Sequence, residues 1–278
     1  MRPRTAFAAA ATAAAVLAPA TAATATPGGH EARGHLRAVG LVDGTQLVTF
    51  SVTHPGKVKP TGTVRGLQGD TRLVGIDARV QDGQVYGVGD RGGVYVLDVH
   101  RAAATRVLQL SVPLEGTAFG VDFNPVANAL RVVSDTGQNL RQSFARTDAG
   151  YPATAVDTAL TTPPAAGTTT GVTAAAYTNN DTDPATATTL FVVDVNADVV
   201  AVQSPANSGT LAPTGKLGAD LTGDVGFDVT GTTGYLVVPG TGERAGRSTV
   251  HEVSLLTGKA TLVGTLDAAV GDLALRLP

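Results

Sequence analysis

The stretch Phe119-Gly120-Val121-Asp122 recurs along the chain and decides the fold. Close copies are Val74-Gly75-Ile76-Asp77 and Val225-Gly226-Phe227-Asp228, a degenerate copy is Thr173-Ala174-Ala175-Ala176, and a truncated copy is Val270-Gly271-Asp272. Successive copies lie roughly 45 to 55 residues apart, and a period of this size is typical of repeat architectures. Because short β-like runs fill each unit, the repeat predicts an all-β fold of the β-propeller type.

The unit over residues 73–110 shows how one repeat is built. Four runs rich in Val and Leu are separated by turns such as Asp82-Gly83, which supplies the positive φ of a tight hairpin. Four antiparallel strands in about 40 residues correspond to one propeller blade. The units that begin near residues 118, 172 and 225 repeat this layout, although the fourth strand of the unit at 118 is indistinct.

The two ends of the repeat region complement each other. Residues 38–67 supply three strand-like runs, the last at 62–67, and residues 270–275 supply a single run that resembles a first strand. Pairing the ends would complete a blade and remove two exposed sheet edges. We therefore predict one domain over 38–278, a propeller of five four-stranded blades closed by its N- and C-terminal strands. The alternatives are an open β-sandwich, or a six-bladed ring with a hidden unit in 139–171.

The first 22 residues resemble a secretory signal peptide. Arg2 and Arg4 form a basic start, an Ala-rich apolar run follows, and small residues precede a cleavage site after Ala22. Residues 23–37 are rich in Gly, Pro and polar residues, which predicts a disordered lead-in. No stretch reaches the 18 consecutive apolar residues of a membrane helix. We therefore expect a secreted or cell-envelope protein without a membrane span.

The composition argues against several classes of function. The chain has no cysteine, which excludes disulfides, thiol catalysis and Cys-ligated zinc. Its formal net charge is −3, and loss of Arg2 and Arg4 would make it more negative, which disfavours nucleic-acid binding. The five histidines lie outside the repeated motifs, so Ser134 has no evident base for a serine hydrolase. We expect a monomer without enzymatic activity.

The repeated aspartates support two interpretations. Gly75 and Asp77 share a strand face because side chains alternate along a strand. In the favoured interpretation, Asp77, Asp122 and Asp228 accept hydrogen bonds that lock one blade to the next. In the alternative, they form a carboxylate ring at the mouth of the central channel and hold Ca²⁺ or another hard cation, as a calcium site or a metal-dependent enzyme. Ala176 interrupts that ring, and no other cofactor is expected.

The densest polar motif covers residues 120–141. Its Asn124-Pro125 and Asp135-Thr136-Gly137 segments have the composition of turns. One interpretation is therefore a hairpin capped by its own side chains. The other is a polar binding site at a loop-rich end of the fold, formed by Arg131, Ser134, Asp135, Gln138, Asn139 and Arg141.

This motif resembles the bacterial domain-of-unknown-function family 4394. Members carry close versions of G-F-D-F-N-P, here at 120–125, and of R-V-V-S-D-T-G-Q-N-L-R, here at 131–141. Further matches extend the resemblance over roughly residues 38–275, and only one hairpin, at 254–256, departs from the family pattern. The resemblance implies an exported, repeat-built β domain and carries no activity. We therefore expect a non-catalytic binding or cell-envelope interaction module, whose partner is an unknown protein or surface ligand.

Overall fold

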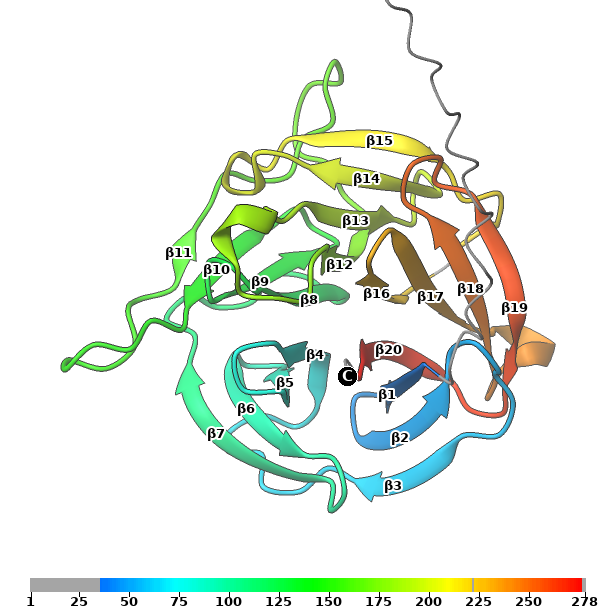
Figure 1. Cartoon of the computed structure of the whole chain (residues 1–278), viewed down its shortest axis with the longest axis horizontal. Helices are drawn as coiled ribbons and strands as arrows, with labels where there is room; N and C mark the ends of the chain where they lie inside the picture. Colours follow the sequence, from blue (N-terminus) through cyan, green and yellow to red (C-terminus); the bar gives the residue numbers. More distant parts are fainter. Residues whose placement is uncertain (1–35, 222, 277–278) are drawn as a thin grey trace, which may run out of the picture. The chain divides into compact units, whose positions relative to one another are not determined.

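The chain forms a ring of five four-stranded antiparallel blades around a central channel (Figure 1). The computed structural model describes residues 36–221 and 223–276. The predicted signal peptide and most of the predicted lead-in lie outside these residues. Three short 3₁₀ helices, η1 (Pro184–Thr186), η2 (Ala206–Ser208) and η3 (Gly242–Arg244), interrupt the described loops.

Each blade is a separate sheet, and in blades 2 to 5 the strands are arranged in chain order from the channel outwards. Blade 2 contains β4 (Leu73–Arg79), β5 (Gln84–Gly89), β6 (Gly93–Asp98) and β7 (Ala103–Gln109). Blade 3 contains β8 (Phe119–Asn124), β9 (Ala129–Ser134), β10 (Asn139–Ser143) and β11 (Ala155–Val156). Blade 4 contains β12 (Val172–Tyr177), β13 (Leu190–Asp194), β14 (Val199–Gln203) and β15 (Leu211–Lys216). Blade 5 contains β16 (Gly226–Thr230), β17 (Thr233–Pro239), β18 (Ser248–Ser254) and β19 (Ala260–Leu266).

Blade 1 joins the two ends of the chain, and this confirms the predicted closure. It contains β20 (Val270–Leu275) as the inner strand, followed by β1 (Arg37–Val42), β2 (Gln46–Ser51) and β3 (Lys59–Thr63). β1 and β20 pair antiparallel, with Ala38 opposite Leu275 and Gly40 opposite Leu273. The five-bladed count is confirmed as well, because 139–171 adds only β10 and the two-residue β11 to blade 3.

One sequence-based strand boundary was wrong. The third strand of blade 1 was expected at 62–67 but lies at Lys59–Thr63. Pro60 is tolerated there because β3 is an edge strand, which does not need every backbone donor. β1 begins at Arg37, one residue before the expected start of the domain.

The glycines of the repeat allow the five inner strands to approach one another closely. A Cβ atom added at Gly120 would lie 2.5 Å from the carbonyl carbon of Ala174 in the neighbouring blade. One added at Gly226 would lie 2.5 Å from the Cα atom of Asp272. Real Cβ atoms do not come this close to backbone atoms, so the inner wall of the channel requires glycine at these positions.

The hydrophobic core lies between the faces of neighbouring blades. One cluster joins blades 1 and 2 through Val39, Leu47, Leu73, Ile76 and other buried side chains. Similar clusters fill the other seams, so each blade is held by both of its neighbours. The inner strands are therefore fixed on both sides, which positions their polar side chains rigidly in the channel.

The described part of the chain contains no helix long and apolar enough to cross a membrane.

Candidate functional site

The repeated aspartates connect neighbouring inner strands through backbone hydrogen bonds. Asp77 Oδ2 in β4 accepts a bond of 2.8 Å from the N–H of Phe123 in β8. Asp122 in β8 accepts one of 3.0 Å from Tyr177 in β12, and Asp228 in β16 accepts one of 2.6 Å from Leu275 in β20. The carboxylates therefore act as blade-to-blade locks, as in the favoured interpretation of the sequence.

These bonds also define which residues are equivalent around the ring. The donor residue in each bond comes directly after the position that holds aspartate in a complete repeat, as Phe123 comes after Asp122. The donors Tyr177 and Leu275 therefore place Ala176 and Ala274 at this position in β12 and β20. Asp272 therefore stands where other blades have glycine, and its sequence-based alignment with Asp77 was wrong. Its Oδ2 accepts a 2.7 Å bond from the N–H of Ile76, which joins β20 to β4. This bond lies two residues before the position at which the repeated aspartates act.

Asp77, Asp122 and Asp228 come together at one point in the channel. Each offers a carboxylate oxygen, and these oxygens all lie within 4.8 Å of one another. All three side chains are buried, with exposed fractions of 6, 4 and 7%. They line a cavity of about 10 Å³, which is room for one ion or water molecule. The three residues that sequence reasoning offered as metal ligands are thus assembled; whether they hold a metal stays a prediction.

The environment of Asp77, Asp122 and Asp228, here called the triad, disfavours negative charge. Burial, together with the neighbouring aspartates, raises the pKa of Asp77 and of Asp122 well above the usual range. Burial also raises the pKa of Asp228 to about 7, although the N–H groups of Leu275 and Val229 act in the opposite direction. None of the described residues that line the cavity is Lys or Arg. The triad therefore needs protons or a bound cation to offset its charge.

We predict that, without metal, the protein loses stability as the pH rises from 5 to 7.5. A carboxyl group whose pKa is raised in the folded chain binds more protons in the folded than in the unfolded chain. Its contribution to the free energy of unfolding is therefore complete below about pH 4, the pKa of the unfolded chain, and declines as the pH rises towards about 7, the pKa of Asp228 in the folded chain. Melting temperatures recorded across this range in metal-free buffer measure the effect. In Asp228→Asn, which cannot ionise at this position, the decline should be smaller; an equal decline in both proteins would contradict the assignment.

The geometry and chemistry of the triad suit a hard cation. Ca²⁺ binds oxygen ligands at about 2.3–2.6 Å, so two oxygens on opposite sides of the ion lie about 4.6–5.2 Å apart. The spacing of the triad oxygens is compatible with an ion placed among them. Asn179 and Asn180 line the same cavity and carry amide oxygens, which are further ligands of the kind that Ca²⁺ accepts.

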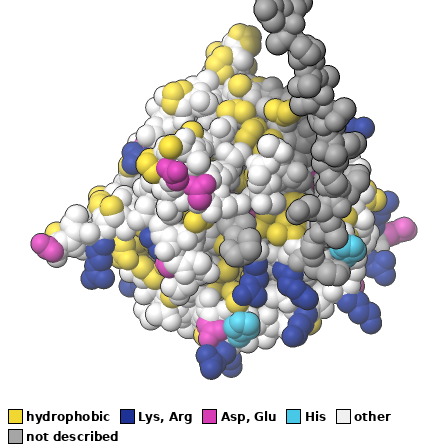
Figure 2. Space-filling view, in the orientation of Figure 1, with side chains coloured by type: hydrophobic (Ala, Val, Ile, Leu, Met, Phe, Trp, Pro, Cys, Tyr) yellow, Lys and Arg dark blue, Asp and Glu magenta, His cyan; other side chains and the backbone are white. Residues whose placement is uncertain are grey.

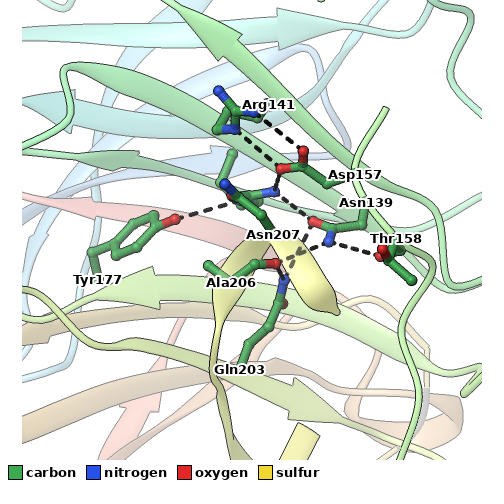
Figure 3. A network of polar contacts seen from close by, with 9 residues as sticks. Asn139, Arg141, Asp157, Thr158, Tyr177, Gln203, Ala206 and Asn207 are labelled. Carbon is green, nitrogen blue, oxygen red and sulfur yellow. Dashed lines mark hydrogen bonds and ion pairs between the residues drawn. The ribbon is translucent and has the colours of Figure 1, made fainter. Parts of the chain in front are cut away.

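Three residues of the polar motif, Arg131, Asn139 and Arg141, belong to a network between blades 3 and 4. The Arg131 side chain is 1% exposed, and its guanidinium donates to Asp157 and Asn139, both at 2.7 Å. It also donates to Asn207, which lies in η2 of blade 4, at 2.8 Å. Figure 3 shows Arg141, Asp157, Asn139 and Asn207 pointing towards one another.

The other three residues of the motif lie where β9 leads into β10, with Ser134 as the last residue of β9 and Asp135 and Gln138 in the connection. Ser134 is buried and its hydroxyl accepts a bond from the N–H of Thr136. Both carboxylate oxygens of Asp135 accept bonds from Thr117, and the Gln138 side chain bonds to the backbone of Pro113 and Glu115. The six residues thus form two separate groups, each with internal partners; whether either binds a ligand stays a prediction.

Sequence reasoning missed Asp157, Asn207 and the true position of Asp272. Asp157 and Asn207 lie in irregular segments outside any repeat, so no periodic pattern marks them. Asp272 follows Val270-Gly271, which imitates the repeated theme. Hydrogen bonding from Ile76 is what reveals its role.

The model of a protein family described as a domain of unknown function, DUF4394, matches residues 46–274. The match covers most of the chain, so this protein belongs to that family. No curated protein matches the chain.

Solved structures with similar folds are distant in sequence. A structural genomics protein of unknown function from Bacteroides thetaiotaomicron has a TM-score of 0.50 at 16% identity, over 86% of this chain and 63% of its own. An auxiliary nutrient binding protein from Bacteroides ovatus has a TM-score of 0.40 at 12% identity, over 63% and 46%. PorZ, a surface component of the type-IX secretion system of Porphyromonas gingivalis, has a TM-score of 0.36 at 13% identity, over 79% and 30%. The chain thus spans less than two thirds of the length of each of these proteins.

Proposed function

We propose that this member of the DUF4394 family is an exported, non-catalytic binding module in which a hard divalent cation organises the mouth of the central channel. The observation that carries the proposal is the convergence of Asp77, Asp122 and Asp228, whose ligand oxygens lie within 4.8 Å of one another. A divalent cation offsets the charge that burial otherwise opposes, in the same way that protons do at low pH.

The size of the cavity favours a structural ion over a catalytic one. About 10 Å³ beside the triad accommodates an ion or a water molecule, whereas small-molecule pockets usually measure about 300–1,000 Å³. Asp77, Asp122 and Asp228 also hold backbone N–H groups of neighbouring blades, so they cannot move towards a substrate without breaking these locks. A cation held here stabilises the ring and fixes the loops around Asn179 and Asn180, which then present a rigid binding face.

Export is part of the same proposal. It is supported by the signal-like sequence of the first 22 residues. A calcium site suits an exported protein, because extracellular modules function with Ca²⁺ affinities of about 10⁻⁴–10⁻³ M.

We expect millimolar Ca²⁺ to raise the melting temperature of metal-free protein at pH 7.5. A ligand that binds only the folded state stabilises it by mass action, by about 0.4–1.4 kcal/mol when its concentration is about 1–10 times the dissociation constant. The rise should be smaller at pH 5, because protons then compete for the same carboxylates. Differential scanning calorimetry with Ca²⁺ or Mg²⁺, together with elemental analysis of the purified protein, makes the measurement.

The controls are two double variants that each replace two aspartates by asparagines, so both lose the same number of carboxyl groups. Asp77→Asn/Asp228→Asn should abolish the rise, whereas Asp148→Asn/Asp220→Asn, at two exposed positions, should retain it. If Ca²⁺ has no effect on the parent protein at pH 7.5, or the same effect on both double variants, the triad is a set of protonated blade locks and the proposed function fails.

A further inference from the structure

A second concave site lies in the seam between blades 1 and 2, apart from the triad. This pocket has a volume of about 370 Å³. A neighbouring pocket of about 330 Å³ shares Val99, His100 and Arg276 with it, and that pocket is also lined by Asp98, which is paired with Arg101. The larger pocket, here called the seam pocket, is lined by Arg37, Thr49, Lys59, Pro60, Thr61, Val99, His100 and Arg276.

The pairing of strands in blade 1 brings the cationic side chains together. Arg37 lies two residues before Val39, whose side chain packs in the core between blades 1 and 2, so both side chains face blade 2. Val39 is opposite Thr49, and Thr49 is opposite Lys59 on the edge strand β3. On the other side of β1, the N–H of Arg276 donates to the carbonyl oxygen of Arg37 at 2.8 Å.

Blade 2 completes the pocket from the opposite side. Val99 and His100 lie in the turn between β6 and β7, and both line the seam pocket. Three strands of blade 1 and one turn of blade 2 therefore place two arginines, one lysine and one histidine around a single depression.

Among the described residues, no acidic side chain in the lining of the seam pocket offsets its positive charge. Arg276 directly follows β20 and is joined to Arg37 of β1 by a backbone hydrogen bond, and like charges placed opposite each other at paired strands repel. Within residues 36–221 and 223–276, no carboxylate lines the seam pocket or forms an ion pair with Arg37, Lys59 or Arg276. The chain as a whole is negative, so this concentration of positive charge does not follow from its composition. Figure 2 shows Lys and Arg side chains gathered over the half of this face that blades 1 and 2 occupy.

We propose that the seam pocket binds a phosphoryl group. The planar guanidinium groups of Arg37 and Arg276 can each present two donors to neighbouring phosphate oxygens, and Lys59 adds a further positive charge. The hydroxyl groups of Thr49 and Thr61 supply neutral donors in the same lining. A doubly charged phosphate offsets three cations better than a single carboxylate does, and the volume leaves room for the group that carries the phosphate.

The test uses two soluble probes, inorganic phosphate and glycerol 3-phosphate, in calcium-free buffer at constant ionic strength. Each should raise the melting temperature of the parent protein in a saturable manner, whereas chloride at equal ionic strength should not. The rise should be lost in Arg37→Gln/Arg276→Gln and reduced in Lys59→Gln. It should persist in Arg247→Gln, which removes an exposed arginine outside the pocket.

Two further measurements complete the test. Without phosphate, Arg276→Gln should melt no lower than the parent protein, because it removes one of two opposed charges. The phosphate-induced rise should also persist in Asp77→Asn/Asp228→Asn, so the outcome does not depend on the cation site. No rise with either probe, or a rise that Arg37→Gln/Arg276→Gln retains, would overturn the proposal.

The source of the phosphate is distinguished by sedimentation with vesicles. Phosphatidylcholine vesicles that contain phosphatidic acid present the same phosphate monoester on a membrane surface. Co-sedimentation that is lost in Arg37→Gln/Arg276→Gln would assign the pocket to a lipid headgroup. Phosphate-dependent stabilisation without co-sedimentation would assign it to a soluble phosphate ester.

Discussion

Deletion of residues 270–278 is expected to abolish cooperative folding. β20 is the inner strand of blade 1, and its loss exposes the inner edge of β1 to solvent. Val270, Leu273 and Leu275 are at most 1% exposed, and burial of each such side chain contributes roughly 1.5–3 kcal/mol. Their combined loss is comparable to the 5–15 kcal/mol that stabilises a typical domain.

The deletion also breaks polar contacts across the channel. The N–H of Ile76 loses its acceptor because Asp272 is removed, and Asp228 loses the N–H of Leu275. The control is a chain that ends at Arg276, which keeps all of β20 and should unfold as the full chain does. Circular dichroism during heating and urea titration compares the three proteins. If the chain lacking 270–278 melts cooperatively at the same temperature as the full chain, β20 does not close the ring.

The repeat made most of the fold predictable because it records physical requirements of the inner strands. Gly120 and Gly226 are needed where backbones meet, and Asp77, Asp122 and Asp228 are needed where a neighbouring N–H must be satisfied. Both requirements recur in blades 2, 3 and 5, so they appear in the sequence as a period. The closure was predictable for a related reason: three strands at one end and one at the other cannot be stable as open edges.

Features that break the period were not predictable. β3 carries Pro60 and mostly exposed or half-buried residues, so neither its alternation nor its composition marks its boundaries. β11 is only two residues long and lies within a long irregular segment. Ala274 occupies the position of the repeated aspartate, and Gly271-Asp272 imitates the motif although Asp272 lies two residues before that position.

The triad and the seam pocket also differ in how far the sequence could predict them. The triad could be predicted because its members occupy equivalent positions in different blades, and the ring brings equivalent positions together. The seam pocket could not, because the predicted closure does not fix the register of β1 against β20, and that register brings Arg276 beside Arg37. Lys59 joins them through the register between β2 and β3, which the shifted boundary of β3 had obscured.

The second large effect is expected for Arg131→Met. Removing one partner of a buried ion pair costs about 3–5 kcal/mol when the remaining charge is left unpaired. Because Arg141 still contacts Asp157 from a more exposed position, the loss here should fall near the lower end of that range. Arg131 is 1% exposed and the Asp157 side chain 8%, so water cannot replace the lost contacts easily. Asn139 and Asn207 lose donors as well, which weakens the connection between blades 3 and 4.

Arg141→Met is the matched control, because Arg141 contacts the same carboxylate from a more exposed position. Its side chain is 36% exposed and bonds to Asp157 at 3.1 and 3.2 Å. Exposed ion pairs contribute about 0–1 kcal/mol, so this variant should lose little stability. Urea unfolding at an unchanged m-value gives both free energies. Arg131→Met/Asp157→Leu should recover part of the loss, since removing both charges leaves neither one buried alone. Equal losses for Arg131→Met and Arg141→Met would mean that the buried contact contributes no more than the exposed one, and that the two blades are joined by their apolar seam alone.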